Sequence, residues 1–584
     1  MQVRNCGLLI MRLIDSFAKY TISEFGFAPR KSQIKAAELL AYKHSLVHMD
    51  TGEGKTVVAA LAALMAVRDN RRVYIVTVND YLAKRDMEMF RRLFSKLGYS
   101  SMLNTLDGNK QAIHSGDIIY TSVQNLLFDY VSNEFNPDGI QFDLDMAILD
   151  EIDYILLDSA NTRYSVSMGD GCIKQDTMLL DAIWYFTDTL SRDEFTVEVA
   201  KKRLALKDSV YEKIETAFSI TPDNPSYVDV MYLYHTALMA RLCYLNGVDY
   251  LVEPDGVLSI INRYNGRACR NSFYEHELDY FLRKKENIRF VSMSGGLCNT
   301  MSAPILFRKF KTAVGMSGTT MQARKELGIL LGTATKRIAP TRRNRRVDRQ
   351  IHFKTRQEKY VYIKDFISEH RKKYAYLVIA EHESEACEIY EMLRFCYSSN
   401  LLTNQHLDNE QKLINNAGRA GHVLVSTHLV GRGTDIITNA EHGVCVFITH
   451  RGTDPRVVIQ ARGRAGRNGI AGLTMTLLSD EDECGYYGAD FEAQRAISLC
   501  EDIIFENAKL SLVEWAEKHE ITGYAPFWLD FRNSMRGRIF VCCPDSINSM
   551  IYSACEKVKQ EMKVLVVDIK KAHQCLEVFR NDAF

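Results

Sequence analysis

The stretch that decides the fold is MDTGEGKT, residues 49–56, followed by small and apolar residues at 57–67. Gly52 and Gly54 allow the backbone to turn tightly, so that its amide groups can point at an anion. The apolar run predicts a helix, and the positive end of its dipole would add to that attraction. The motif therefore predicts a phosphate-binding loop, although Met49 stands where the full Walker pattern has its first glycine.

The residues of this loop predict an ATP site that contains Mg²⁺. Lys55 is expected to place its charge on the β- and γ-phosphates, and the Thr56 hydroxyl is expected to bind the metal. Upstream, Gln33 has an amide that can donate and accept together, which suits the adenine edge; a surface glutamine is the alternative. The nucleotide-binding residues predicted here are Gln33, Thr51, Gly52, Glu53, Gly54, Lys55 and Thr56.

A pair of carboxylates follows a short apolar run at 146–149, which reads as a buried parallel strand. In α/β folds, ligands bind at the carboxyl ends of such strands. Asp150 is therefore expected to hold the water shell of Mg²⁺, and Glu151 to orient and deprotonate the attacking water. A solvated acidic turn is the alternative, which the upstream phosphate loop disfavours.

A second set of motifs lies downstream, where a predicted strand at 422–426 leads into GRGTDI at 431–436 and RGRAGR at 462–467. Arg464 and Arg467 are three residues apart and would share one face of a helix. Aimed across a cleft, they would stabilise charge on the transferred phosphoryl group; a general anion patch is the alternative. The nucleotide contacts predicted in the first of these motifs are Arg432 and Asp435. Together the motifs predict two RecA-like lobes with ATP between them.

Three further stretches make the resemblance specific: TVNDYLAKRD at 77–86, DEIDYILLD at 150–158 and GMSGTT at 315–320. With the loop and the arginine motifs, they resemble the SecA family of preprotein translocase motors and not RNA helicases. The resemblance implies an ATPase that moves unfolded polypeptide in protein export. It also implies that the segment 315–320 relays the nucleotide state to the parts that grip the substrate.

About 150 residues separate DEIDYILLD from GMSGTT, enough for an additional domain. The resemblance implies a preprotein-binding domain there, and strand patterns at 248–252 and 257–261 flank a turn typical of a hairpin. After this hairpin the family has an acidic pair, whereas this chain has Asn262 and Arg263. At the C-terminal end, apolar residues repeat as heptads over 551–579, which predicts a long helix that packs on the motor or coils with a partner.

The fold class predicted is α/β, with two RecA-like parallel-sheet lobes, a preprotein-binding-like domain inserted in the first lobe and a helical C-terminal region. The run of arginines at 341–349 is predicted to be a solvated linker between the lobes, with acidic lipid headgroups or phosphates as alternative contacts. The predicted division is a first lobe at 1–158, an inserted domain at 159–310, a return to the first lobe and linker at 311–345, a second lobe at 346–483 and the C-terminal region at 484–584.

Composition limits the class of function. Of the 584 residues, 46% are hydrophobic and 25% charged, which excludes a wholly disordered chain. Lys+Arg and Asp+Glu both number 73, and this neutral balance disfavours nucleic acid as the partner. The scattered cysteines favour a reducing compartment, and no apolar run is long enough to span a bilayer. These features predict a cytoplasmic protein, with peripheral contact at the membrane left open.

The predicted partners are an unfolded polypeptide, then a membrane protein-conducting channel and acidic lipids; the oligomeric state is not predicted. Two alternative functions remain at this point. One is a nucleic-acid-dependent helicase-like ATPase of superfamily 2, which the neutral charge and the large insert disfavour. The other is a non-translocating, ATP-switched binding protein derived from SecA, which the altered Asn262–Arg263 segment and the departures at the C-terminal end favour.

Overall fold

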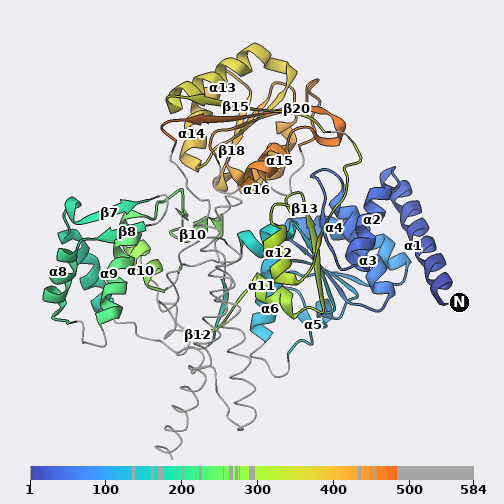
Figure 1. The fold of residues 1–584 in the computed structure, drawn as a ribbon, viewed down its shortest axis with the longest axis horizontal. Helices are drawn as coiled ribbons and strands as arrows, with labels where there is room; N and C mark the ends of the chain where they lie inside the picture. Colours follow the sequence, from blue (N-terminus) through green and yellow to red (C-terminus); the bar gives the residue numbers. More distant parts are fainter. Residues whose placement is uncertain are drawn as a thin grey trace, which may run out of the picture. The chain divides into compact units, whose positions relative to one another are not determined.

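A computed structural model describes residues 2–133, 139–159, 163–168, 177–199, 203–221, 227–253, 255–261, 268–269, 274, 276–288, 296–342, 344–431, 436–451 and 455–482. These residues form two compact units (Figure 1). The first unit contains residues 2–168 and 296–341, and the second contains residues 177–288 and 342–482. Each unit is described by itself.

The first unit is built on a seven-stranded sheet in the order β14-β1-β13-β5-β2-β4-β3, in which all neighbouring strands are parallel. Strands distant in sequence become neighbours, because β13 returns after the insert to lie between β1 and β5. The predicted strand at 146–149 is confirmed as β5. The strands are β1 (Leu46–His48), β2 (Val73–Thr77), β3 (Ser101–Leu103), β4 (Ile118–Ser122), β5 (Met146–Asp150), β13 (Thr312–Ser317) and β14 (Thr335–Arg337).

Alternate residues of each strand point to opposite faces of this sheet, and helices cover the side chains on these faces. On β2, Val73 and Ile75 join the core formed with α2 and α3, whereas Tyr74 faces Phe310 and His114 on the other side. The helices are α1 (Gln2–Phe25), α2 (Lys31–Ala41), α3 (Lys55–Arg68), α4 (Asp80–Lys96), α5 (Lys110–His114), α6 (Val123–Asn133), α11 (Ala303–Lys309) and α12 (Arg324–Leu331), with a π-helical turn at Tyr154–Asp158.

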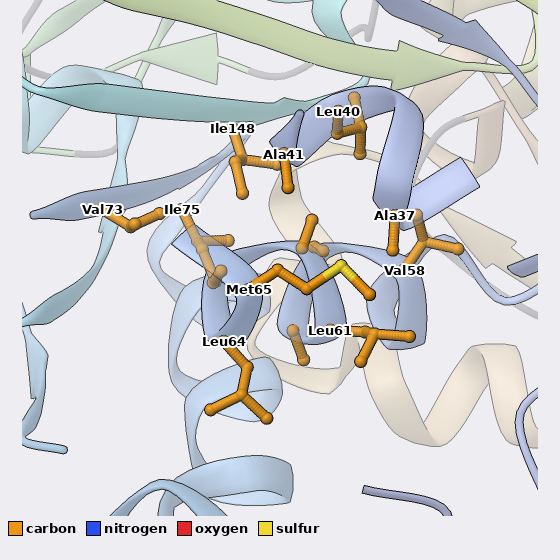
Figure 2. Packing of buried hydrophobic residues seen from close by; sticks show 14 of the residues in the cluster. Ala37, Leu40, Ala41, Val58, Leu61, Leu64, Met65, Val73, Ile75 and Ile148 are labelled. Atoms are coloured by element: carbon orange, nitrogen blue, oxygen red, sulfur yellow. The ribbon is translucent and has the colours of Figure 1, made fainter. Parts of the chain in front are cut away.

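Helix α3 is central to this core, because all of its residues from Val57 to Val67 are buried. An apolar surface on every side suits a helix packed between a sheet and other helices. Figure 2 shows Val58, Leu61, Leu64 and Met65 of α3 among Ala37, Leu40 and Ala41 of α2 and Val73, Ile75 and Ile148 of the sheet. The phosphate loop is therefore joined to one of the most buried helices of the unit.

The insert leaves and re-enters the first unit on two antiparallel strands, β6 (Arg163–Met168) and β12 (Gly296–Ser302). The predicted hairpin is confirmed, since β9 (Tyr250–Val252) and β10 (Leu258–Ile261) pair antiparallel. The insert has its own core, in which Trp184 stacks on Phe281. Its other elements are α7 (Thr177–Phe186), β7 (Phe195–Glu198), β8 (Arg203–Leu206), α8 (Asp208–Phe218), α9 (Tyr227–Leu242), β11 (Ala268–Cys269) and α10 (His276–Lys285), with short 3₁₀ turns at Thr187–Thr189 and Arg192–Glu194.

The second lobe, residues 344–482, is a six-stranded parallel sheet in the order β15-β20-β19-β16-β18-β17. The predicted strand at 422–426 is confirmed as β18. Its strands are β15 (Arg345–Phe353), β16 (Ala375–Ile379), β17 (Ser399–Leu402), β18 (Val423–Ser426), β19 (Val444–Ile448) and β20 (Ala471–Ser479). Its helices are α13 (Arg356–His370), α14 (Glu383–Leu393), α15 (Glu410–Ala417) and α16 (Pro455–Arg462), with 3₁₀ turns at Arg371–Lys373, Asn404–Asn409, His428–Gly431 and Arg467–Gly469.

The prediction that the arginines at 341–349 form a linker is wrong for most of the run. Residues 345–349 begin β15, the edge strand of the second sheet, which pairs along its full length with β20. An edge strand tolerates charged side chains because one side of it stays in water. Arg345 and Arg349 are accordingly exposed, while Arg346 is half-buried and donates to the Arg462 carbonyl oxygen at 3.1 Å.

Several predictions fall outside the described residues. These are Arg432 and Asp435, the Asn262–Arg263 segment, and the C-terminal region at 484–584 with its heptads at 551–579. Among the helices that the structure describes, none is both long enough and apolar enough to cross a membrane.

Candidate nucleotide-binding site

The phosphate loop connects β1 to α3 and depends on two glycines with left-handed backbone. Gly52 has φ +85° and Gly54, the residue that caps α3, has φ +79°. A side chain at Gly54 would also collide, because a Cβ there would lie 2.5 Å from Nε2 of Gln33. The left-handed backbone therefore favours glycine at this position, and a side chain there would also displace the Gln33 amide.

Lys55, at the end of the phosphate loop, forms an ion pair with Glu151, the residue that follows β5. Lys55 Nζ lies 2.6 Å from Glu151 Oε1, and the two side chains are only 10% and 12% exposed. Burial works against the charged form of Lys55, but the carboxylates of Glu151 and Asp150 outweigh it and raise its pKa. The lysine is therefore held as a cation at the end of the loop, where the sequence predicts phosphates to bind.

Glu151 belongs to a chain of hydrogen bonds that crosses from β5 to β13. Ser317 donates its hydroxyl proton to Glu151 Oε2 at 3.0 Å, and Thr319 donates to Asp153 Oδ2 at 2.7 Å. The Thr319 amide donates to the Ser317 hydroxyl oxygen at 3.2 Å, which links the two pairs. The segment 315–320, predicted as a relay, thus contacts two of the three acids of the DEID stretch directly, Glu151 and Asp153.

The backbone at Glu151 is strained. Its φ of +56° is rare for a residue other than glycine, asparagine or aspartate. Such strain costs on the order of 1–3 kcal/mol and is tolerated where the surrounding structure imposes it, often at functional sites. Here it aims the Glu151 side chain at Lys55 and Ser317.

Asp150, at the end of β5, has a pKa raised to about 7. Burial is the largest cause, Lys55 acts in the opposite direction, and the charges of Glu151 and Asp86 raise the pKa further. Mg²⁺ prefers oxygen ligands and usually keeps several waters and phosphates besides one or two protein groups. The Asp150 carboxylate and the Thr56 hydroxyl are oxygen ligands of that kind, so the residues present fit this ion.

Asp86 is a buried acid at this site that the motifs did not predict as functional. It lies on α4, its charge acts on Asp150, and it is paired with Arg85, whose Nη2 lies 2.7 Å from Asp86 Oδ1. Burial is the main cause that raises its pKa, and Arg85 counteracts it. The signal was its place at the end of the TVNDYLAKRD stretch, but its interaction with Asp150 depends on the tertiary fold.

Gln33 is buried at 2% exposure, so the alternative of a surface glutamine is wrong. Its Nε2 donates to the Glu53 carbonyl oxygen at 2.9 Å, and its Oε1 accepts from the Arg30 amide at 2.8 Å. These bonds hold the phosphate loop against the start of α2. Each amide atom can still make one further hydrogen bond, as contact with an adenine edge requires.

The side chain of Glu53 points away from the loop. Its carboxylate accepts from the amide and the hydroxyl of Thr341 at 3.2 and 2.9 Å and pairs with Arg30 at 3.1 Å. Thr341 immediately precedes the second unit in the chain. Glu53 therefore anchors the exit from the first unit, while its backbone belongs to the loop.

The prediction that Arg464 and Arg467 share a helical face is wrong. Helix α16 ends at Arg462, Arg464 lies in the following turn, and Arg467 begins a 3₁₀ turn. Gly466 separates them with φ +75°, and a Cβ there would lie 2.7 Å from the side chains of Asn344 and Arg346. Arg464 is buried, and Arg467 donates through Nε to the Gly463 carbonyl oxygen at 2.8 Å.

The phosphate loop, the acids at the end of β5 and a second parallel sheet define a two-lobed P-loop protein with RecA-like lobes. The family model described as the SecA DEAD-like domain matches residues 9–328, and the one described as the SecA P-loop domain matches residues 340–442. The chain therefore belongs to the SecA family.

Two relatives illustrate how much of the family the chain covers. It is 30% identical to protein translocase subunit SecA 2 of Staphylococcus epidermidis over 480 residues. The aligned region covers 78% of the chain and 59% of that protein. It is 31% identical to protein translocase subunit SecA of Clostridium tetani over 460 residues. Here the aligned region covers 76% of the chain and 54% of that protein. The chain thus spans little more than half the length of these relatives.

A solved structure of S. cerevisiae Dbp5 bound to RNA and ADP–BeF₃ is similar with a TM-score of 0.43 and 14% identity, over 80% of this chain and 88% of that one. A likeness at this level carries no argument about what the chain binds.

Proposed function

We propose that the chain is an ATPase of the SecA type, which couples ATP turnover to the binding and movement of unfolded polypeptide. The observation that carries the ATPase is the network of Lys55, Glu151 and Ser317 at the end of the phosphate loop. The polypeptide substrate is supported by membership of the SecA family. It remains a proposal, because the chain spans only part of its relatives.

The Lys55–Glu151 ion pair suggests how the site would respond to ATP. A γ-phosphate attracts Lys55 through two or more negative oxygens and would draw Nζ away from Glu151. The released carboxylate would then accept a proton from the attacking water. In this proposal the Lys55 ammonium group and the Glu151 carboxylate stay paired with each other, and neither acts on a ligand, until the nucleotide has bound.

The remaining residues of the site have supporting tasks in this proposal. Thr56 and Asp150 hold Mg²⁺, which supplies positive charge to the phosphates when bound. Gln33 contacts adenine, and the loop amides of residues 51–54 cradle the phosphates. Arg464 and Arg467 stabilise the charge that develops on the transferred phosphoryl group, with Arg432 and Asp435 as further nucleotide contacts.

We propose further that the protein works in the cytoplasm and at the membrane surface. The partners would be a membrane protein-conducting channel and acidic lipids. This follows from family membership alone. The exposed Arg345 and Arg349 on β15 are candidates for the lipid contact, because lysine and arginine near an anionic surface contribute attraction at about 1 kcal/mol each.

Steady-state ATP turnover tests this proposal. It is measured for the purified chain alone, with an unfolded polypeptide that carries an export signal, and with single-stranded RNA. Stimulation by polypeptide alone is the expected result. Stimulation by RNA alone would replace it with the helicase-like function, and turnover that ignores both would indicate an ATP-switched binding protein.

A further inference from the structure

We infer that Glu53 is a positioning residue that couples the phosphate loop to the exit segment, residues 338–341, through which the chain leaves the first unit. Nucleotide binding at the loop tightens the hold of Glu53 on this segment. The inference rests on the proposed ATP site and names the residue through which that site acts on the rest of the chain. Glu53 suits this role because its main chain belongs to the loop, whereas its side chain holds Thr341, the last residue of the first unit.

The Glu53 carboxylate makes contact with two segments. Its side chain is 11% exposed, and Arg30 Nη1 lies 3.1 Å from Oε2. Oε1 accepts from the Thr341 amide at 3.2 Å, and Oε2 accepts from the Thr341 hydroxyl at 2.9 Å. Thr341 is itself exposed, so water competes for its amide whenever the bond to Glu53 opens.

The main chain of Glu53 is held by the start of helix α2. Its carbonyl oxygen accepts from Arg30 Nη2 at 2.7 Å and from Gln33 Nε2 at 2.9 Å. Arg30 therefore contacts Glu53 at both the carbonyl oxygen and the carboxylate. Because one guanidinium group joins the two ends of the residue, a shift of the loop main chain is passed to the carboxylate and from there to Thr341.

Ser32, in the first turn of α2, adds a third connection. Its hydroxyl lies 3.0 Å from the Thr341 hydroxyl. A carboxylate can only accept, so the Thr341 proton goes to Glu53 and the Ser32 hydroxyl is the donor in this second bond. The start of α2 thus holds the loop through Arg30 and Gln33, and it holds the exit segment through Ser32.

A bound nucleotide strengthens this arrangement. In the proposed site the adenine contacts Gln33 and the phosphates contact the amides of residues 51–54, so the ligand ties the loop to the start of α2. These are the two segments that hold Thr341. By linkage, a ligand that stabilises the anchored state binds that state more tightly, and loss of the anchor weakens its binding by the same factor.

The test is hydrogen–deuterium exchange of the peptide at 338–345, measured in the full chain with Mg²⁺, with and without saturating AMP-PNP. Exchange at residues 51–56 reports nucleotide binding in the same experiment. In the unaltered chain, AMP-PNP should slow exchange of the exit segment by about tenfold or more, the factor expected of one hydrogen bond to a charged group. In Glu53→Ala, exchange of the exit segment should be fast and nearly insensitive to AMP-PNP at concentrations that still protect residues 51–56.

Variants of Thr341 separate coupling from a merely structural role of Glu53. Thr341→Val loses the hydroxyl bond and should reduce the effect of AMP-PNP, whereas Thr341→Ser keeps the hydroxyl and should retain the effect. Thr341→Val should add little in a Glu53→Ala background, because both changes remove the same bond. Glu38→Ala, which removes an exposed acid on α2, should leave the effect of AMP-PNP unchanged.

The outcomes that contradict the inference are distinct from those that contradict the ATP site. The inference is overturned if AMP-PNP slows the exit segment of a folded Glu53→Ala protein as much as that of the unaltered chain. Should this variant not fold, an undiminished effect in Thr341→Val overturns it. Protection of residues 51–56 without any change in the exit segment of the unaltered chain does the same. Failure of AMP-PNP to bind the unaltered chain would instead overturn the proposed function, and the inference with it.

Discussion

Each lobe has a buried lysine near the carboxyl ends of its parallel strands. The two lysines differ in how many protein oxygens hold the ammonium group. Lys55 in the first lobe is 10% exposed and has one close carboxylate partner, Glu151. Lys359 on α13 in the second lobe is 1% exposed; its Nζ lies 2.6 Å from both the Thr449 carbonyl oxygen and Asp482 Oδ1. Glu385 lies further away, at 3.7 Å.

The difference indicates which lysine can act on a ligand. A lysine has three protons to donate, and Lys359 already directs two of them to protein oxygens on separate segments. To move Lys359 would take the nearest cation away from Asp482 and leave only Arg356, at 3.8 Å, which is costly. Lys55 stands at the end of a glycine-rich loop with its partner on a strand end, and an incoming phosphate can replace that partner. We therefore expect loss of Lys55 to affect catalysis and loss of Lys359 to affect stability.

The largest effect is expected from Lys55→Ala. ATP turnover should fall to background, because no other described side chain in the loop carries a positive charge to the phosphates. The variant should remain folded by circular dichroism. Steady turnover in a folded Lys55→Ala protein would contradict both the assignment of the site and the comparison of the two lysines.

Arg467→Ala should come next. If the second lobe contributes its arginines to the transferred phosphoryl group, kcat should fall by about 10³-fold while the affinity for nucleotide is retained. Turnover and binding of a fluorescent ATP analogue give the two values. An unchanged kcat would restrict the second lobe to a structural role in hydrolysis.

Lys359→Met should act on stability alone. It removes the nearest cation from Asp482, which keeps Arg356 at 3.8 Å and two bonds from Ser479, and it leaves the Thr449 carbonyl without this donor; the free energy of unfolding should fall by about 1–3 kcal/mol. Urea denaturation measures this effect, and ATP binding by the folded variant should be unaffected. Lys311→Met is the matched control: its ion pair with Asp145 has similar length, but the lysine is 80% exposed, so the unfolding midpoint should barely move. Equal effects of the two changes would remove the distinction drawn here.

The smallest effect is expected from Gly54→Ala, which changes the support of Lys55 and not Lys55 itself. Left-handed backbone costs an alanine about 1–2 kcal/mol, and here the new methyl group also meets the Gln33 amide. Nucleotide affinity should fall about tenfold or more, because the loop must shift. Gly98→Ala has the same backbone strain with nothing within 4 Å, so it should lower stability but leave nucleotide affinity unchanged.

Local patterns in the sequence predicted much of the fold. The short apolar runs before Asp150 and before Thr427 are confirmed as strands, and the run after Thr56 is confirmed as a helix. Such elements are readable because burial on both faces leaves a continuous apolar signal. The RGRAGR motif was harder: α16 ends at Arg462, and Gly466, which lies between Arg464 and Arg467, packs against Asn344 and Arg346, far away in the chain.

The candidate site also has a part that the sequence predicted and a part that it did not. Gln33, Lys55 and Glu151 were recognisable by residue type and spacing, but nothing in the spacing showed that Lys55 and Glu151 form an ion pair. Asp86 could not be selected, since an acid on a helix is most often a solvated side chain. Its interaction with Asp150 exists only because the sheet order places β2, the strand that precedes α4, beside β5.

The sequence by itself determined the chemistry that the first lobe can support: a glycine-rich loop with a lysine and a threonine, and acids at the end of a buried strand. These depend on residue type and on contacts between neighbours in the chain, which local patterns express. Only the tertiary structure decided which groups are partners. The return of β13 after the insert brings Ser317 and Thr319 to Glu151 and Asp153, and packing of separate segments immobilises Lys359. Such pairings depend on long-range packing, which residue order does not display.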